Sequence, residues 1–259
     1  MLHLSVKNAG VEKASANGGN ELFLVYRGVY EEGDVIALTA DEYPVFVRVH
    51  LEDALGDAVL YLTGALEYEV PFGEYTKRVS PQAFAGDVHY MHAAVLQEEE
   101  KHNYVDLMLN PYDQHDTETV FPHMTANAET RGEAVFYSLN VNNGIIANDS
   151  HGDWPYASWG IDGWKYAAIT VHFGRPVDVD AVTVYFRADF PHDNWWEKIA
   201  LEFSDGERRA YDMQKTGEGQ KLVINKKGIT EITMKELIMS DDPSPWPALS
   251  ALKAWGKLA

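Results

Sequence analysis

Short runs of β-branched and aromatic residues recur in the first part of the chain, and their spacing constrains the fold more than any other feature. Five such runs, from ELFLVYRGVY to EYEVPF, precede residue 75. Gly, Pro, Asp and Glu separate them at intervals of about eight to twelve residues. This spacing is typical of antiparallel sandwiches or barrels rather than β-α-β units. The sequence therefore predicts an all-β fold.

A charged segment, LQEEEKHN at residues 96–103, interrupts the apolar runs. Composition also shifts beyond it, because all seven tryptophans follow residue 150. We therefore expect a boundary near residue 100, with an N-terminal sandwich-like domain at residues 1–100 and a second sandwich at residues 101–259. The alternative interpretation is a solvated strand end or helix turn within one larger domain.

Turn residues predict how the second half is divided into strands. Residues 168–190 are expected to form a hairpin that turns at Gly174–Pro176, and residues 198–213 a hairpin that turns at Asp205-Gly206. Residues 220–239 are expected to form two further strands. In the tail, large apolar residues spaced three apart predict a short amphipathic helix over residues 245–259.

Charge and cysteine content exclude several classes of function. The formal net charge is −19, so nucleic acid and anionic membrane surfaces are poor partners. The absence of cysteine excludes disulfides, thiolate metal sites and cysteine nucleophiles. The first residues lack signal-peptide character, so we expect a cytoplasmic protein; a secreted or cell-surface protein whose leader had been removed would show the same sequence.

The segment RADFPHDNWW, residues 187–196, follows a strand whose alternation is clear. Val184 and Phe186 share the apolar face, so Arg187 is expected to point to solvent or a cleft. One of the two adjacent tryptophans is expected to close the core, because neighbouring residues in extended chain point in opposite directions. The remaining polar and aromatic residues of this loop are Asp189, His192, Asp193 and Trp195.

A second aromatic and polar loop lies at residues 142–164 and contains His151, Trp154 and Tyr156. Such a loop suits sugar recognition, because an aromatic ring can pack under the apolar face of a pyranose. Arginine, aspartate and histidine side chains can bond its hydroxyl groups. Together the two loops predict a carbohydrate site with Arg187, Asp189, His192 and His151 as polar contacts and Trp154 or Trp195 as the stacking ring.

The chain from residue 103 onward resembles the galactose-binding-like jelly roll of discoidin-type domains and carbohydrate-binding modules. Three features carry the resemblance: LMLN at residues 107–110, the long loop NNGIIANDSHGDWPYASWG, and ITVHFGRPVDVDAVTVYFR with its Phe-Gly-x-Pro pattern. The resemblance implies ligand binding by loops at one end of the sandwich. It matches Arg187 with a strand-end arginine and the His151 loop with a ligand loop. FPHDNWW is not a general motif of the family, and the resemblance does not extend to residues 1–100.

The family often carries a structural calcium ion, for which Asp113, Asp116 or Asp149 would supply oxygen ligands here, although no complete calcium-loop pattern is matched. We expect no other cofactor. Two alternatives to non-catalytic sugar binding stay open. One is a protein assembly module, in which the N-terminal β domain mediates homo-oligomerisation. The other is a carbohydrate-active lyase or hydrolase, although no complete catalytic motif is present.

Overall fold

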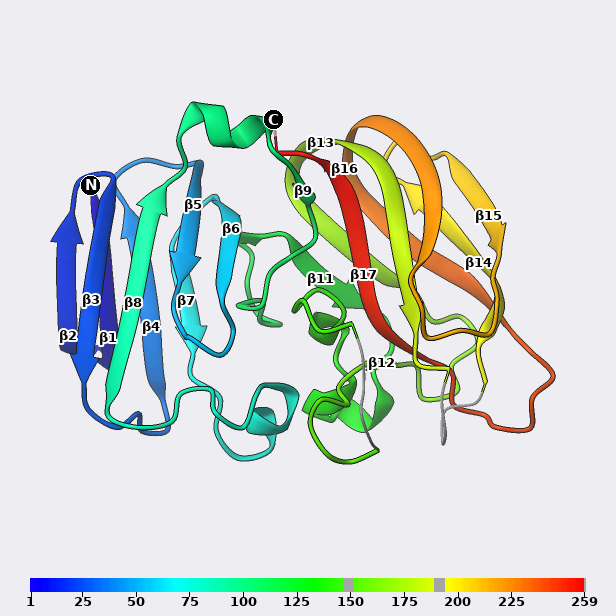
Figure 1. Ribbon diagram of the computed structural model, residues 1–259, viewed down its shortest axis with the longest axis horizontal. Coiled ribbons are helices and arrows are strands. Elements are labelled where there is room, and N and C mark those ends of the chain that lie inside the picture. Colours follow the sequence, from blue (N-terminus) through cyan, green and yellow to red (C-terminus); the bar gives the residue numbers. More distant parts are fainter. Residues whose placement is uncertain (147–150, 189–193, 259) are drawn as a thin grey trace.

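The computed structural model describes residues 1–146, 151–188 and 194–258 and confirms an all-β protein. Its first part is a sandwich of two antiparallel sheets (Figure 1). One sheet has the strand order β2-β1-β4-β7 and the other has the order β10-β6-β5-β8-β3. Their strands are β1 (Leu2–Asn8), β2 (Val11–Gly18), β3 (Glu21–Arg27), β4 (Asp34–Ala40), β5 (Val45–His50), β6 (Asp57–Leu62), β7 (Leu66–Glu69), β8 (Val88–Val95) and β10 (Val120–Phe121).

The second part is built on one larger antiparallel sheet with the order β12-β17-β13-β16-β14-β15; β9 also pairs with β17, and β11 with β13. Its strands are β9 (Tyr104–Asp106), β11 (His123–Ala126), β12 (Trp159–Gly160), β13 (Ile169–Phe186), β14 (Trp196–Phe203), β15 (Arg208–Asp212), β16 (Gln220–Met239) and β17 (Ala248–Lys257). Short 3-10 helices are η1 (Gly73–Arg78), η2 (Glu98–His102), η3 (Thr130–Gly132), η4 (Ala134–Phe136) and η5 (Ser138–Asn140). None of the described helices is long and apolar enough to cross a membrane.

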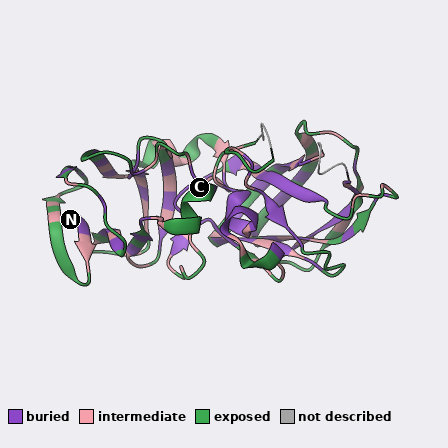
Figure 2. Ribbon diagram, turned by 90° about the horizontal axis from the view of Figure 1, so that it is seen from below, coloured by how far each residue is buried: buried purple, intermediate pink, exposed green. Residues whose placement is uncertain are grey.

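Each part has its own hydrophobic core (Figure 2). In the N-terminal core, alternate residues of β3 and β5 are buried; the sequence pattern predicts this for β5, whereas residues 22–26 of β3 are apolar on both faces. In the C-terminal core, Trp196 packs at a ring-centroid distance of 6.1 Å from Trp159 and 5.5 Å from Phe186. Trp196 is fully buried, which confirms that one tryptophan of the adjacent pair closes the core.

The predicted turn at Gly174–Pro176 is absent, and residues 220–239 form one strand where two are predicted, because β13 and β16 are long, bulged strands. The register of β13 against β16 shifts between His172 and Val177, where the sequence predicts a hairpin. Gly174 lies in this bulge with a φ of 67°, and a Cβ atom there would lie 2.4 Å from the ring of Phe121. Glycine is required for this close approach to β10 of the N-terminal sheet. The Asp205-Gly206 hairpin between β14 and β15 is confirmed.

The predicted C-terminal helix is wrong, because residues 248–257 form strand β17. β17 lies between β12 and β13 in the sheet and also pairs with β9. Its first five residues are all buried, so it lacks the alternation by which a half-exposed strand is recognised.

The chain passes between the two parts more than once beyond residue 100. Residues 104–106 pair with β17, whereas residues 120–121 pair with β6 of the N-terminal sheet. Tyr112 belongs to the N-terminal core, and its hydroxyl donates to the carbonyl of Gly56 at 2.5 Å. The segment between these strands therefore ties the two parts together, and a domain boundary near residue 100 stays a prediction.

Candidate functional site

A pocket of about 360 Å³ lies at the end of the C-terminal part where β12 and β17 begin. We call it the Trp246 pocket. Its lining comes from three stretches far apart in sequence: Thr130, Arg131, Phe136, His151, Gly160, Ile161, Asp162, Gly163, Pro245, Trp246, Pro247 and Ala248. The indole of Trp246 is 47% exposed. The pocket therefore combines an accessible aromatic ring with cationic, anionic and imidazole groups.

Strand pairing fixes the geometry of the Trp246 pocket. Trp159 pairs with Leu249 and Gly160 with Ala248, which brings the residues flanking both strands side by side (Figure 1). The indole Nε1 of Trp159 also donates to the carbonyl of Ala128 at 2.8 Å. This bond holds the segment before η3 against β12. A short two-residue ladder thus positions all three lining stretches.

Polar side chains are oriented within the pocket wall. The Arg131 guanidinium binds the Glu133 carboxylate through two bonds of 2.6 and 2.8 Å and lies 5.4 Å from the Phe136 ring centre. This ion pair raises the pKa of Arg131 and lowers that of Glu133. The backbone N–H of Asp162 donates to the hydroxyl of Thr130 at 3.0 Å. Arg131 is therefore charged and held at the pocket.

Arg187 lies behind this wall, and the prediction that it points to solvent or a cleft is wrong. It is only 1% exposed. Its Nη1 donates to the carbonyl of Tyr156 at 2.6 Å, and its guanidinium carbon lies 6.0 Å from the Tyr156 ring centre. The segment that carries Tyr156 packs on Arg187 just beyond the end of β13. Arg187 therefore fixes this segment, and direct contact with a ligand would require the segment to move.

The structure brings three predicted site residues together. The His151 and Tyr156 rings lie 6.5 Å apart, and Tyr156 packs on Arg187. His151 lines the Trp246 pocket, whereas Tyr156 is buried beneath it with Val135 and Phe136. Trp154 is exposed on the same segment but is not among the lining residues.

Trp195 lies elsewhere in the C-terminal part. Its ring is partly buried against the main core and stands 5.3 Å from the Lys215 ammonium group. Its carbonyl accepts a bond of 3.0 Å from the N–H of Ser240. The predicted site residues Asp189, His192 and Asp193 lie outside the described residues.

Asp113 does not fit a calcium site. It is fully buried, and its two oxygens bind His123 Nδ1 at 2.7 Å, the Met124 N–H at 2.8 Å and the Asn142 amide at 3.0 Å. Asp116 lines a different cavity, and Asp149 lies outside the described residues. Among the residues that the structure describes, no group of three or more His, Asp or Glu side chains could hold a metal ion. Calcium binding through Asp116 or Asp149 stays a prediction.

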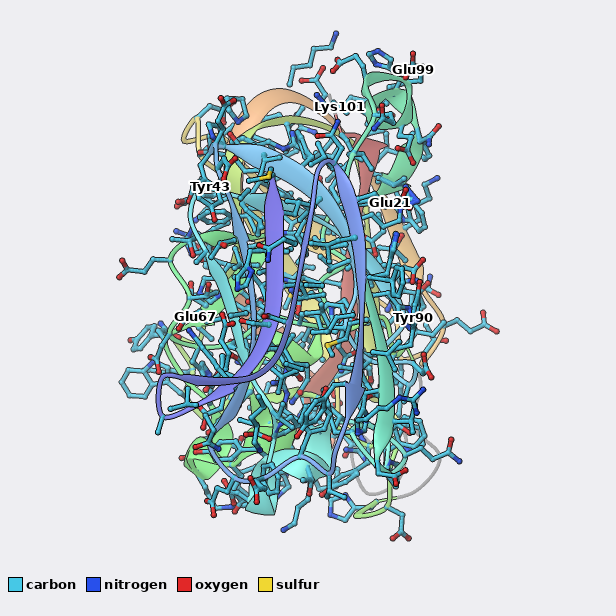
Figure 3. All side chains as sticks on the ribbon, turned by 90° about the vertical axis from the view of Figure 1, so that its left-hand side faces the viewer. Glu21, Tyr43, Glu67, Tyr90, Glu99 and Lys101 are labelled. Atoms are coloured by element: carbon cyan, nitrogen blue, oxygen red, sulfur yellow. The ribbon has the colours of Figure 1, made fainter. Side chains whose placement is uncertain are left out.

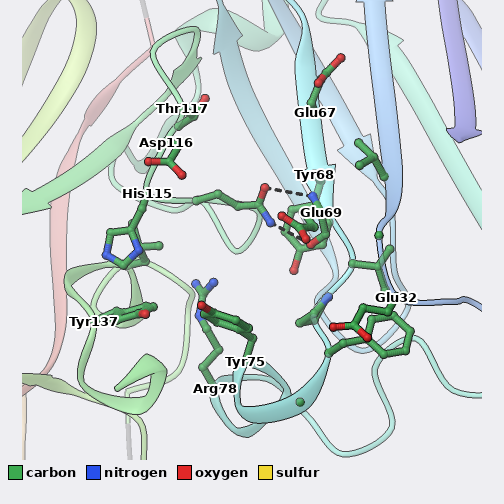
Figure 4. Close-up of a pocket in the computed structure, with 18 of the residues that line it drawn as sticks. Glu32, Glu67, Tyr68, Glu69, Tyr75, Arg78, His115, Asp116, Thr117 and Tyr137 are labelled. Carbon is green, nitrogen blue, oxygen red and sulfur yellow. Dashed lines mark hydrogen bonds between the residues drawn. The ribbon is translucent and has the colours of Figure 1, made fainter. Parts of the chain in front are cut away.

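A larger cavity of about 880 Å³ lies between the two parts, and Figure 4 shows it. We call it the Arg78 cleft. The side-chain amide of Gln114 forms two bonds, of 3.0 and 2.8 Å, with the backbone of Glu69 and so borders the cleft beside β7. Tyr75 and Tyr137 also line the cleft and form an aromatic pair whose ring centres lie 6.5 Å apart. Of the predicted site residues that the structure describes, only the calcium candidate Asp116 lines this cleft.

Arg78 supplies the buried cation of the cleft. It is 8% exposed, and its contacts with Asn140 Oδ1 and the Asp113 carbonyl, at 3.4 and 3.5 Å, exceed the usual length of an N–H···O bond. Figure 4 shows its guanidinium pointing into the cavity near Tyr75 and Tyr137. The cleft also carries the carboxylates of Glu32, Glu67, Glu69, Glu74, Asp116 and Glu118. It suits a polar ligand with both donor and acceptor groups.

Sequence reasoning missed Trp246, Arg131 and Asp162, although all three line the Trp246 pocket. Trp246 stands between Pro245 and Pro247, and this Pro-Trp-Pro sequence is a loop signal that the helix prediction ignored. The backbone of Asp162 has a positive φ of 50°, and Gly163 follows it, as is typical of a tight turn. Arg131 likewise has a positive φ, of 53°, directly before Gly132.

Comparison with known proteins finds no matching family model and no matching curated protein. Among solved structures, the module CpGH89CBM32-4 of Clostridium perfringens, in complex with GlcNAc-alpha-1,4-galactose, is 18% identical at a TM-score of 0.39, covering 60% of this chain and 95% of the module. Chitosan-binding module 1 of a chitosanase/glucanase from Paenibacillus sp. IK-5 is 14% identical at a TM-score of 0.41, covering 59% and 99%. The lectin domain of lectinolysin, complexed with Lewis B antigen, is 11% identical at 0.42, covering 59% and 97%. These partial likenesses fall in the class that the sequence resembles, and no function is taken from them.

Proposed function

We propose that the protein binds a carbohydrate without converting it, and that the Trp246 pocket holds the sugar. One observation carries this proposal: the exposed Trp246 ring shares a pocket of about 360 Å³ with Arg131, His151 and Asp162. A pyranose needs an aromatic surface for its C–H face and charged or polar groups for its hydroxyls. The net charge of −19 favours neutral or cationic sugars over polyanionic glycans.

Each residue of the pocket has a defined part in this proposal. Trp246 stacks on the sugar ring, while Arg131 and His151 donate hydrogen bonds to its hydroxyl oxygens. Asp162 accepts from a hydroxyl group. Arg187 is a positioning residue, because its bond to the Tyr156 carbonyl holds the segment that carries His151.

Glycan-array screening followed by calorimetry tests the proposal. Trp246→Ala removes the stacking ring and is expected to weaken sugar binding about tenfold or more. The matched control is Trp164→Ala, which deletes an exposed tryptophan that lines no part of the pocket and is expected to leave affinity unchanged. Asp162→Asn keeps the side-chain shape, tolerates the positive φ and is expected to weaken binding less than Trp246→Ala.

Three outcomes contradict the proposal in different ways. Absence of binding to any arrayed glycan contradicts the function. Binding that survives Trp246→Ala but is lost in Tyr75→Ala places the ligand in the Arg78 cleft instead. Steady release of shortened glycan by the wild-type protein, abolished by a substitution in either cavity, shows an enzyme.

A further inference from the structure

Four large apolar side chains are exposed together on the outer face of β3 and β8. The exposed fractions are 63% for Phe23, 37% for Val25, 56% for Val88 and 46% for Tyr90, and we call these residues the β3–β8 patch. Val25 pairs directly with Tyr90 across the two strands, and Phe23 and Val88 flank this pair. Figure 3 shows Tyr90 and Glu21 on one side of the N-terminal part, opposite Tyr43 and Glu67. Contiguous apolar surface of this kind marks an interaction site.

β3 lacks the features that protect an edge strand. It ends the order β10-β6-β5-β8-β3, and within residues 1–146, 151–188 and 194–258 its only ladder partner is β8. Natural edge strands usually carry a central lysine, a proline or a bulge that prevents pairing with other molecules. The middle of β3, from Leu22 to Tyr26, contains no charged residue and no proline, and its register with β8 is unbroken.

The charges at the two ends of β3 favour a second copy of the same strand as its partner. Glu21 begins the strand and Arg27 ends it, and both side chains lie on the exposed face. If two copies of β3 run antiparallel about Leu24, Glu21 of each copy faces Arg27 of the other, and Phe23 faces Val25. Arg27 forms no ion pair among the described residues, whereas Glu21 Oε1 lies 2.8 Å from His92 Nε2 on β8, so Arg27 of the second copy would join this existing pair. The strand is therefore complementary to itself in charge.

We propose that a second copy of this chain pairs with the edge of β3, in a two-fold arrangement that sets β3 antiparallel to its counterpart and joins the two β3–β8 patches side by side on one face. A two-fold axis makes one patch serve both subunits, as in most homodimers. Repulsion between two chains of charge −19 is screened beyond about 8 Å at physiological ionic strength, so charges far from the β3 edge act only weakly on the second copy. This proposal does not depend on sugar binding at the Trp246 pocket.

Analytical ultracentrifugation of the full chain over a wide concentration range gives the first test. Wild type is expected to show a dimer, and Phe23→Lys is expected to weaken association at least about tenfold, because a charge replaces a central apolar contact. Val11→Lys is the matched control: Val11 is exposed on β2, outside the patch, and its substitution is expected to leave association unchanged. A wild-type protein that is monomeric at every concentration overturns the proposal, as does a Phe23→Lys protein that dimerises like wild type.

Charge exchange tests the orientation. Glu21→Arg or Arg27→Glu alone places like charges opposite each other and is expected to weaken the dimer, whereas the double variant restores both pairs and is expected to recover it. A double variant that is no better than the weaker single variant contradicts antiparallel pairing. Far-UV circular dichroism checks that each variant remains folded.

Cysteine cross-linking gives an independent readout, because the natural chain contains no cysteine. Under mild oxidation, a mixture of Phe23→Cys and Val25→Cys chains is expected to form the mixed disulfide dimer. A mixture of Phe23→Cys and Val11→Cys chains is expected to form little of it. Equal cross-linking in the two mixtures shows random collision and overturns the proposed arrangement.

Discussion

Asp106 is expected to make the C-terminal part less stable as the pH rises toward neutrality. The residue lies at the end of β9, where its Oδ1 accepts bonds from the N–H groups of Met108 at 3.0 Å and Ala254 at 3.1 Å. Burial raises the pKa of its carboxyl group from 3.8 to about 6, although these two bonds and the charge of Lys253 oppose the rise. The folded protein therefore holds the Asp106 proton more tightly than the unfolded chain does.

The sign and size of the effect follow from this difference. A raised carboxyl pKa gives a stabilising contribution that is complete below the unfolded value of 3.8 and is lost as the pH rises through the folded value of about 6. At about 1.4 kcal/mol for each pH unit, the contribution amounts to roughly 3 kcal/mol. Asp106→Asn keeps a side-chain oxygen acceptor but cannot ionise. Relative to wild type, its free energy of unfolding should therefore rise by roughly 3 kcal/mol between about pH 3.5 and about pH 8.

Urea unfolding of both proteins across this pH range measures the difference, and other titrating groups cancel in the comparison. Tryptophan fluorescence is the appropriate signal, since all seven tryptophans belong to the C-terminal part that contains β9. Glu129→Gln supplies a control of opposite sign. Burial alone would raise the pKa of Glu129, but bonds from His115 at 2.9 Å and from the Ser138 N–H at 2.7 Å lower it. Its stabilising contribution is therefore lost as the pH falls.

The reasoning is refuted if the difference between Asp106→Asn and wild type stays constant within about 0.5 kcal/mol over this range. If the unfolding free energy of Asp106→Asn falls relative to wild type as the pH rises, the bonds from Met108 and Ala254 outweigh burial. In either case the charged form of Asp106 would be better stabilised than its position against β17 indicates.

Three further substitutions test the core and the junction between the two parts. Trp196→Ala empties a fully buried site and is expected to destabilise the C-terminal part by about 3–5 kcal/mol in urea unfolding followed by fluorescence. Gly174→Ala is expected to lower the thermal midpoint and to reduce the free energy of unfolding by more than about 1 kcal/mol. The new Cβ atom would collide with the Phe121 ring, and alanine disfavours the positive φ at this position. Arg175→Ala removes a guanidinium that lies 4.6 Å from the centre of the Phe46 ring, and its loss is expected to cost about 0.5–2 kcal/mol. Because this contact joins the two parts, the unfolding transitions followed by fluorescence and by circular dichroism should lie further apart in the variant than in wild type.

The N-terminal strands could be predicted from sequence because their signal is local. The alternation of β5 identifies its buried face without knowledge of its partners, whereas the apolar run of β3 predicts a strand but not which of its faces is buried. β17 could not be recognised in this way, since buried residues on both of its faces remove the alternation. Gly174–Pro176 has turn composition, yet pairing of β13 with β16 and β17 on either side carries the chain through as a bulge.

Arg187 shows the limit of strand parity as a guide to exposure. Alternation predicts that Arg187 points away from the face that carries Val184 and Phe186, but it cannot tell whether a residue there meets solvent. Here Tyr156, 31 residues away in sequence, accepts the guanidinium bond, and Arg187 is buried. A buried arginine that holds a loop and an exposed arginine that binds a ligand give the same sequence pattern.

The Trp246 pocket depends on strand pairing that no local pattern specifies. His151 was predicted from the composition of its own loop, whereas Trp246 and Asp162 become site residues only because β12 pairs with the first residues of β17. That ladder spans two residue pairs, and Gly160 makes it possible: a Cβ there would lie 2.5 Å from the Thr130 hydroxyl oxygen. A side chain at position 160 would push η3, which carries Arg131, away from β12. The small glycine therefore sets the distance between the walls of the pocket, although it offers no chemical group to a ligand.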